Sequence, residues 1–209
     1  MHFRNHLTIV LVASLSWFIF SCSDTLLYRA GANYFPLTAG TGWKYLAGID
    51  TIYVEVDTVP AVMLNQSCIR VYRNGAPEYY LSSPTEIRRL FTNTISRPNA
   101  PDTVEHRFAL VYQLPFVVGN SYLERFDTTL TYGPDTVKYT HILAVRVAAI
   151  ENVSTSAGTY YDCYRLEFGE KIFARDTTET TWIEWLAPET GIVRRQTAQG
   201  EEVLVEYRR

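Results

Sequence analysis

From Thr51 onward the chain is a series of short runs rich in Val, Ile, Thr and Tyr, separated by Pro, Gly, Asn and Asp. Runs that alternate in polarity or are β-branched form strands, and the separating residues form turns. Beyond Phe20 no stretch shows the apolar period of an amphipathic helix. The clearest runs are 51–56, 67–73, 136–150, 160–168, 180–186, 191–195 and 203–207. The pattern predicts an all-β domain of about ten to twelve strands.

An internal repeat restricts the fold further. Three patterns recur in the same order at separations of 79, 95 and 104 residues, which grow as insertions in hairpins would make them grow. They are apolar-Pro-apolar-x-x-Gly-x-x-aromatic at 35–43 and 114–122, Cys-x-Arg-apolar at 68–71 and 163–166, and aromatic-Leu…Pro…apolar-Arg-Arg at 80–89 and 185–195. Neither half is large enough to close a core alone. We therefore expect one domain at 34–209, a strongly curved antiparallel sheet (a half-barrel or open barrel) built from two related halves at about 34–107 and 108–209.

The N-terminus has the organisation of an export signal. A segment carrying Arg4 precedes a 14-residue apolar run at 7–20, whereas a membrane-spanning helix needs about 20 residues. The run ends in Ile19-Phe20-Ser21-Cys22, which resembles the lipobox of bacterial lipoproteins. The resemblance implies a signal peptide at 1–21, cleavage before Cys22, and acyl chains such as palmitate on Cys22. The alternative is an ordinary signal peptide with a chance cysteine.

Residues 22–33 follow as a short tether. Ser23 after the cysteine favours delivery to the outer membrane, by the sorting rule of enteric bacteria. We therefore expect a lipid-anchored protein of the bacterial outer membrane, on its periplasmic or cell-surface face. The eleven residues 23–33 reach at most roughly 36 Å, so the domain should lie close to the membrane.

Charge and cysteine content exclude several classes of protein. The chain has 19 Lys and Arg against 22 Asp and Glu, which excludes a strongly basic nucleic-acid binder. Apart from Cys22, only Cys68 and Cys163 are present, and an even pair in an oxidising compartment predicts a disulfide. No Cys/His cluster has the spacing of a metal site, and we expect neither a metal nor a cofactor.

Three segments of the mature chain resemble those of uncharacterised bacterial exported lipoproteins. They are YFPLxxGxxWxY at 34–45, the strand AGTYYDCYR at 157–165, and WLAPETGIV at 185–193, which matches a closing W-x-A-P-G-x-G-[LI]-V element. The resemblance implies an architecture similar to the half-barrel of lipoprotein carriers, with a concave apolar face. A resemblance of folds assigns no activity.

Few residues suggest chemistry. His106 and His141 lie in alternating strand patterns without catalytic partners at motif spacing, so we interpret both as solvated or edge residues. No nucleophile elbow, metalloprotease motif or phosphate-binding loop occurs, and we expect no enzymatic activity.

Aromatic residues are the candidates for a ligand-binding face. They are Trp43, Tyr45, Trp182 and Trp185, and ordinary core packing is the alternative. Trp182 and Trp185 are separated by an odd number of residues, so they should face opposite sides of a strand. The pairs Arg88-Arg89 and Arg194-Arg195 should likewise place one Arg on each face.

Asp-Thr dipeptides occur more often than chance predicts. Seven of eight Asp residues precede Thr, at Thr25, Thr51, Thr58, Thr103, Thr128, Thr136 and Thr177. The pattern resembles the O-glycosylation sequon of some lipoprotein-rich bacterial phyla, in which the Thr carries the glycan. Alternatively, Asp ends a turn and β-branched Thr opens the next strand.

Three functions follow from these observations. The first is a non-enzymatic binding or carrier module that holds an apolar ligand on the concave face. The second is a structural or accessory subunit of an outer-membrane complex, with an envelope protein as its partner. The third is a hydrolase of envelope glycans, which would need two carboxylates about 5–10 Å apart.

Overall fold

The computed structural model of the 209-residue chain describes residues 32–97, 100–132, 135–174 and 177–209. The chain divides into two units, 1–31 and 32–209, and the second contains all the described residues. The expected signal peptide, Cys22 and Thr25 lie outside the described residues. Within the described ranges, no helix has the length and hydropathy to cross a membrane.

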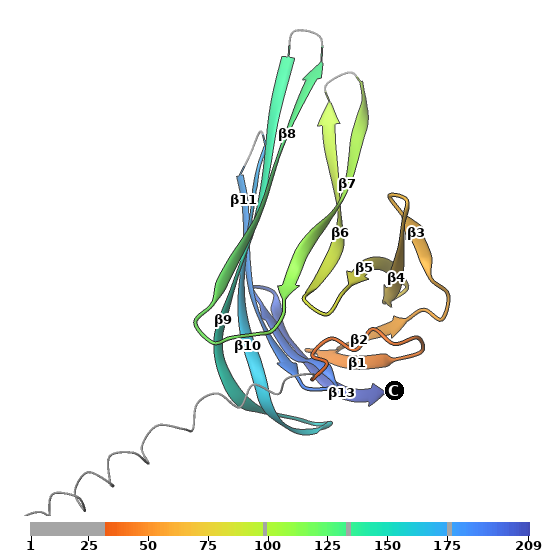
Figure 1. The fold of residues 1–209 in the computed structure, drawn as a ribbon, viewed down its shortest axis with the longest axis vertical. Helices are drawn as coiled ribbons and strands as arrows, with labels where there is room; N and C mark the ends of the chain where they lie inside the picture. The colour runs from red at the N-terminus through yellow and green to blue at the C-terminus, as the bar shows by residue number, and fades with distance from the viewer. Residues whose placement is uncertain (1–31, 98–99, 133–134, 175–176) are drawn as a thin grey trace, which may run out of the picture. The chain divides into compact units, whose positions relative to one another are not determined.

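All the regular elements of the described residues are strands (Figure 1). They are β1 (Gly42–Ala47), β2 (Asp50–Val56), β3 (Ala61–Met63), β4 (Gln66–Arg73), β5 (Ala76–Ser82), β6 (Glu86–Arg97), β7 (Ala100–Gln113), β8 (Ser121–Tyr132), β9 (Asp135–Thr155), β10 (Gly158–Phe173), β11 (Thr177–Ala187), β12 (Gly191–Thr197) and β13 (Gly200–Arg208).

Twelve strands form one antiparallel sheet in the order β7-β6-β5-β4-β2-β1-β13-β12-β11-β10-β9-β8, and β3 pairs only with β4. The sheet curves until it is nearly closed into a barrel. One seam is unsealed, between the end strands β7 and β8. The predicted all-β class, antiparallel pairing, strong curvature and approximate strand number are confirmed.

Backbone hydrogen bonds show the two halves directly. Before β1, the N–H of Gly40 donates to the carbonyl of Val56 at 3.0 Å. Before β8, the N–H of Gly119 donates to Val147 at 2.9 Å. Both glycines have φ in the left-handed region, at 81° and 92°, which explains why the repeat keeps glycine here. The opening element of the repeat therefore folds in the same way twice.

Each half is a six-stranded meander, and the halves meet at two places. In the repeat β1 corresponds to β8, and β7 corresponds to β13. The β1–β13 pair and the β7–β8 pair are therefore equivalent junctions. The first carries a ladder from the pair Gly42–Arg208 to the pair Ala47–Glu202, whereas the second carries none. The expected boundary between residues 107 and 108 falls inside β7, and the halves divide at the 114–120 connection instead.

The core lies on the inner side of the curved sheet. Alternate residues of each strand point inward, as strand geometry requires. Fully buried aliphatic side chains fill this side, among them Leu143, Leu166, Leu186 and Leu204. Aromatic rings complete the packing in edge-to-face pairs, such as Tyr34 with Phe116 at 5.7 Å and Tyr112 with Phe168 at 6.0 Å between centroids.

The turn between β11 and β12 holds the start of the domain. Glu189 has a φ of 59°, at the position where the resembled closing element carries glycine. Its N–H donates to the carbonyl of Asn33 at 2.8 Å, and its carboxylate accepts from the N–H of Asn33 at 2.8 Å. These two bonds offset the cost of about 1–2 kcal/mol for a left-handed side-chain-bearing residue. The chain thus enters the domain at a fixed point.

Candidate binding site

A buried carboxylate lies at the centre of the inner face. Glu184 on β11 is 2% exposed. Its carboxylate accepts hydrogen bonds from Tyr112 Oη at 2.6 Å, Trp182 Nε1 at 3.1 Å and Arg195 Nε at 2.9 Å. The buried charge is therefore both paired and hydrogen-bonded, which is the condition for keeping an ion away from water.

The network continues across the neighbouring strands. Glu184, Arg195 and Glu202 face one another on β11, β12 and β13. Arg73 on β4 reaches Glu202 at 2.5 Å, and Tyr112 comes from β7. These contacts join strands of the first half to strands of the second without a ladder. At this level, packed side chains bridge the inner space between the halves.

The surroundings fix the charge state of this network. Burial, followed by the charge of Glu184, raises the pKa of the Tyr112 phenol well above its usual range. Burial alone would lower the pKa of Arg195, but the Glu184 carboxylate raises it above its ordinary value. At neutral pH the phenol is therefore a permanent donor and the guanidinium a permanent cation. The arrangement favours rigidity rather than proton transfer.

A second polar pair lies farther along the inner face. His141 on β9 is 0% exposed, and its Nε2 lies 2.8 Å from Glu170 Oε1. The rings of Phe91 and Phe126 pack edge-on against the imidazole, at 5.1 and 4.6 Å between centroids. The expectation of a solvated His141 is wrong because β9 directs the residue inward. His106 is exposed as expected, with its Nδ1 3.0 Å from Thr92 Oγ1.

Hydrogen bonds from side chains cross the seam between β7 and β8. Tyr122 Oη donates to the carbonyl of Val111 at 2.6 Å. Thr128 Oγ1 donates to Glu105 at 2.9 Å. No backbone pair joins the two strands within their described residues. At this seam the described main-chain groups of the two end strands are therefore not joined by a ladder.

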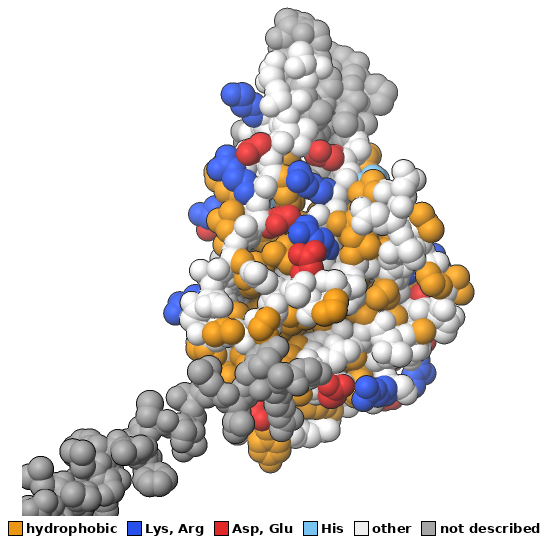
Figure 2. Space-filling model, in the orientation of Figure 1, with side chains coloured by type: hydrophobic (Ala, Val, Ile, Leu, Met, Phe, Trp, Pro, Cys, Tyr) orange, Lys and Arg blue, Asp and Glu red, His pale blue; other side chains and the backbone are white. Residues whose placement is uncertain are grey.

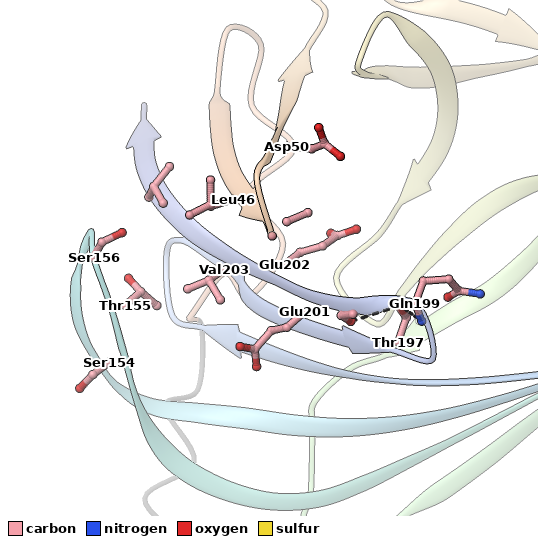
Figure 3. A pocket seen from close by; sticks show the side chains of 14 residues that line it. Leu46, Asp50, Ser154, Thr155, Ser156, Thr197, Gln199, Glu201, Glu202 and Val203 are labelled. Carbon is pink, nitrogen blue, oxygen red and sulfur yellow. Dashed lines mark hydrogen bonds between the residues drawn. The ribbon is translucent and has the colours of Figure 1, made fainter.

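One pocket lies among three hairpin turns (Figure 3). Its volume is about 870 Å³, within the range of small-molecule sites. Leu46 and Asp50 border it from the β1–β2 hairpin, Thr155 from the β9–β10 turn, and Glu201 and Val203 from β13. The Thr155 hydroxyl is occupied within its own turn, where it accepts from the N–H of Ala157 at 3.1 Å. Polar and apolar side chains are mixed in the lining of the pocket.

Acidic and basic side chains are interspersed on the face drawn in Figure 2, and neither sign forms a continuous patch there. Neighbouring opposite charges pair, as in Arg88 with Glu86 at 2.8 Å and Arg125 with Asp127 at 3.0 Å. Such exposed pairs contribute about 0–1 kcal/mol each. This face therefore offers no strong electrostatic attraction to a single-sign partner.

The predicted aromatic residues make contacts within the core, and their role in ligand binding stays a prediction. Trp43 Nε1 donates to the carbonyl of Thr190 at 2.5 Å, and Tyr45 Oη donates to the carbonyl of Ile192 at 2.9 Å. Both side chains are buried and pin β1 against the turn before β12 and the start of that strand. Their contacts are those of core residues that tie the halves together.

The two remaining tryptophans have separate neighbours, as their spacing predicts. Trp182 stacks on Phe168 at 4.8 Å and belongs to the Glu184 network. Trp185 instead donates to Glu151 and lies under the guanidinium of Arg194 at 4.8 Å. The four aromatic candidates therefore do not meet at one site.

The arginine pairs also divide between the faces. Arg88 binds Glu86 and Glu124, whereas the charge on Arg89 acts on Tyr80 in the buried interior. Arg194 binds Glu201, whereas Arg195 enters the Glu184 network. The sequence pattern predicted this division but not the carboxylate between the halves.

Cys68 and Cys163 are free, which corrects the expected disulfide. On β4, Ile69 and Val71 contact the core, so Cys68 faces the opposite side of the strand, and it stands opposite Ala61 in the ladder between β4 and β3. Cys163 belongs to the core cluster. Each thiol contacts a nearby carbonyl at 3.5 Å, that of Ala61 for Cys68 and of Tyr160 for Cys163. Equivalent positions in the repeat thus place the two thiols in different environments.

Both thiols are expected to resist alkylation in the native protein. Burial raises the pKa of Cys163 to about 12 and raises that of Cys68 as well, so little thiolate forms at neutral pH. Treatment with iodoacetamide at pH 8 should leave both unmodified for hours, and unfolding in urea without reductant should expose two reactive thiols per chain. Recovery of none in urea would instead show that the two cysteines are joined.

The Asp-Thr positions differ in exposure. Thr58, Thr136 and Thr177 are exposed, with Thr58 in a turn and the other two at the start of strands. Thr51 is half-buried, and Thr128 is half-buried within β8 and bonded to Glu105. The side chain of Thr103 lies outside the described set. Glycosylation at these positions stays a prediction, and the exposed residues are its best sites because a glycan needs solvent.

Sequence reasoning missed Glu184, Tyr112 and Glu170. Glu184 stands in the run TTWIEWL, where a charge between aromatic residues resembles the solvent side of an alternating strand. Its partner Tyr112 lies 72 residues away. One signal was present: a lone carboxylate within an apolar strand, next to a strand that carries Arg-Arg.

The fold and its contacts define a pseudo-symmetric, nearly closed antiparallel barrel with a buried polar centre. A family model described as DUF3108-like matches residues 112–209, so the second half of the repeat is similar to that family. No curated protein matches the chain. The chain is also similar to a crystal structure of a protein from Parabacteroides distasonis ATCC 8503, provisionally described as a lipoprotein. Identity is 14% and the TM-score 0.48, and the alignment covers 85% of this chain and 99% of that one.

Proposed function

We propose that this chain is a lipid-anchored lipoprotein of the bacterial outer membrane whose β-domain is a non-enzymatic binding module. One observation carries the proposal: the lipobox-like Ile19–Cys22 stands a few residues before a folded domain whose first segment is tied down. The main chain of Asn33 forms two hydrogen bonds with Glu189, one with its N–H and one with its carboxylate. The eleven residues 23–33 allow a reach of roughly 36 Å, so a lipid on Cys22 holds the domain at the membrane surface.

The geometry favours a protein partner over a small ligand. The Glu184 network and the packed rings bridge the inner side of the sheet, which leaves this level rigid. In contrast, β7 and β8 present two strand edges side by side. Strand edges are the usual sites at which folded domains capture extended segments of other proteins.

An apolar ligand on the inner face is the second candidate. The rings of Phe91, Phe126, Phe168 and Trp182 line the inner face on both sides of the seam, and they favour this reading. Native mass spectrometry of protein extracted in mild detergent separates the two candidates. A stoichiometric mass beyond chain and anchor that is lost when the protein is denatured supports the apolar ligand, and its absence supports the protein partner.

Replacing Cys22 by serine should abolish anchoring. Each buried methylene of the acyl chains contributes about 0.8 kcal/mol, so several chains on Cys22 make the native attachment stable. The Cys22→Ser variant should therefore accumulate as uncleaved precursor or appear in the soluble fraction, as read by fractionation and intact mass. The matched control is Cys68→Ser, which should remain processed and membrane-bound. A processed, membrane-bound Cys22→Ser variant would contradict the proposal.

A further inference from the structure

The contacts across the seam share a single register. Val111 meets Tyr122, Arg107 lies over the ring of Phe126 at 4.7 Å, and Glu105 meets Thr128. The residue numbers of each pair add up to 233, which is the signature of two antiparallel strands in register. The two edges are therefore aligned as sheet neighbours, although no ladder joins their described residues.

The equivalent junction shows what the seam lacks. Between β1 and β13, a ladder joins residues Gly42–Ala47 of β1 to β13, with one register shift after Lys44. At the seam, the Tyr122 phenol occupies the carbonyl of Val111, an acceptor that a neighbouring strand would use. Side chains substitute for a strand here. Each such contact contributes only about 0.5–1.5 kcal/mol, so another main chain can replace it.

The chemistry of an edge selects its occupant. In an edge strand, alternate N–H and C=O groups point away from the sheet and require hydrogen-bond partners. An acyl chain would bury these groups unsatisfied, at a cost of about 1–3 kcal/mol each. A peptide backbone satisfies them. The occupant that fits is therefore an extended protein segment.

We propose that the β7–β8 seam is a strand-addition site that captures an extended segment of a partner protein, which pairs antiparallel with β7. Strand β7 is the longer edge, with 14 residues against 12 in β8. Antiparallel pairing is the more stable arrangement. This inference rests on the proposed binding function and names the class of its partner.

The probe is a synthetic peptide with the sequence of residues 121–132, which already has the register that β7 accepts. Full-length lipidated protein in detergent should bind it, with hydrogen–deuterium protection confined to β7. In the variant Glu105→Cys/Thr128→Cys, closing the seam with a short bis-maleimide should weaken binding at least tenfold relative to the same variant before cross-linking. Cys68 and Cys163 should not interfere because both are buried.

The matched control is Thr92→Cys/His106→Cys. These residues are also in contact, at 3.0 Å, but they face each other on β6 and β7, which a ladder already joins. Cross-linking them should leave peptide binding within twofold.

Three outcomes overturn the inference. The first is no binding up to the solubility limit of the peptide, and the second is equal binding before and after the seam is cross-linked. The third is dimerisation of the protein that cross-linking of the seam abolishes. The last would identify a second copy as the occupant. None of these outcomes bears on Cys22→Ser fractionation, so the anchored-module proposal can fail or stand separately.

Discussion

Replacing Glu184 by alanine is expected to lower the free energy of unfolding by about 3–5 kcal/mol. The variant leaves Arg195 in the interior, where Glu202 at 3.6 Å is the remaining ion-pair partner among the described residues. It also removes the acceptor of the Tyr112 phenol and of the Trp182 indole. An uncompensated buried charge costs far more than the lost pair contributed. Urea unfolding followed by circular dichroism measures the change.

The matched control is an ion pair on the neighbouring pair of strands, β12 and β13. Glu201 binds Arg194, but both side chains are 39% exposed. Glu201→Ala should therefore cost about 0–1 kcal/mol. The double variant Glu184→Leu/Arg195→Met should recover much of the lost stability, because it removes both buried charges together. If Glu184→Ala costs no more than Glu201→Ala, the network does not hold the halves together.

The sequence predicted those parts of the fold that depend on neighbouring residues. The repeat keeps glycine at positions 40 and 119 because each occupies the equivalent turn of its half and adopts a positive φ there. The alternation of side chains along a strand was enough to predict that Trp182 and Trp185 face opposite sides, and that Arg194 and Arg195 do so as well. These properties depend on local backbone geometry, and the apolar and turn residues report that geometry directly.

The candidate site depends on closure of the sheet, which no local pattern encodes. Whether Glu184 points to solvent or to the interior depends on the curvature that brings Tyr112 opposite β11. The same limit explains the wrong disulfide: the Cys-x-Arg pattern correctly marked equivalent positions, but Cys68 lies outside the core cluster that contains Cys163. The open seam could not be predicted from the sequence either. Strand β8 has the same repeat pattern as β1, and β1 forms a ladder with β13.

Alkaline pH is expected to unfold the protein through its buried phenols. Burial raises the pKa of Tyr45, Tyr80, Tyr112 and Tyr122 above the usual range, and raises that of Tyr139 to about 12. In the unfolded chain each phenol titrates near pH 10. The folded state therefore favours the neutral form. The stability that these buried neutral phenols contribute is fully present below pH 10 and is lost as pH rises above that value. The loss is about 1.4 kcal/mol per phenol for each unit by which its folded pKa exceeds its unfolded pKa.

Absorbance at 295 nm and circular dichroism, recorded together from pH 9 to 13, measure this loss. We expect fewer than the 15 tyrosines to ionise while the fold persists, followed by a joint step in which the remaining phenols ionise as ellipticity disappears. Tyr53→Phe, at a 59% exposed position, should leave the step in place. Tyr112→Phe should make stability fall less steeply above pH 10, because one buried phenol no longer titrates on unfolding. Smooth ionisation of all the tyrosines with unchanged ellipticity would show instead that water reaches the interior, and that the Glu184 network does not close it.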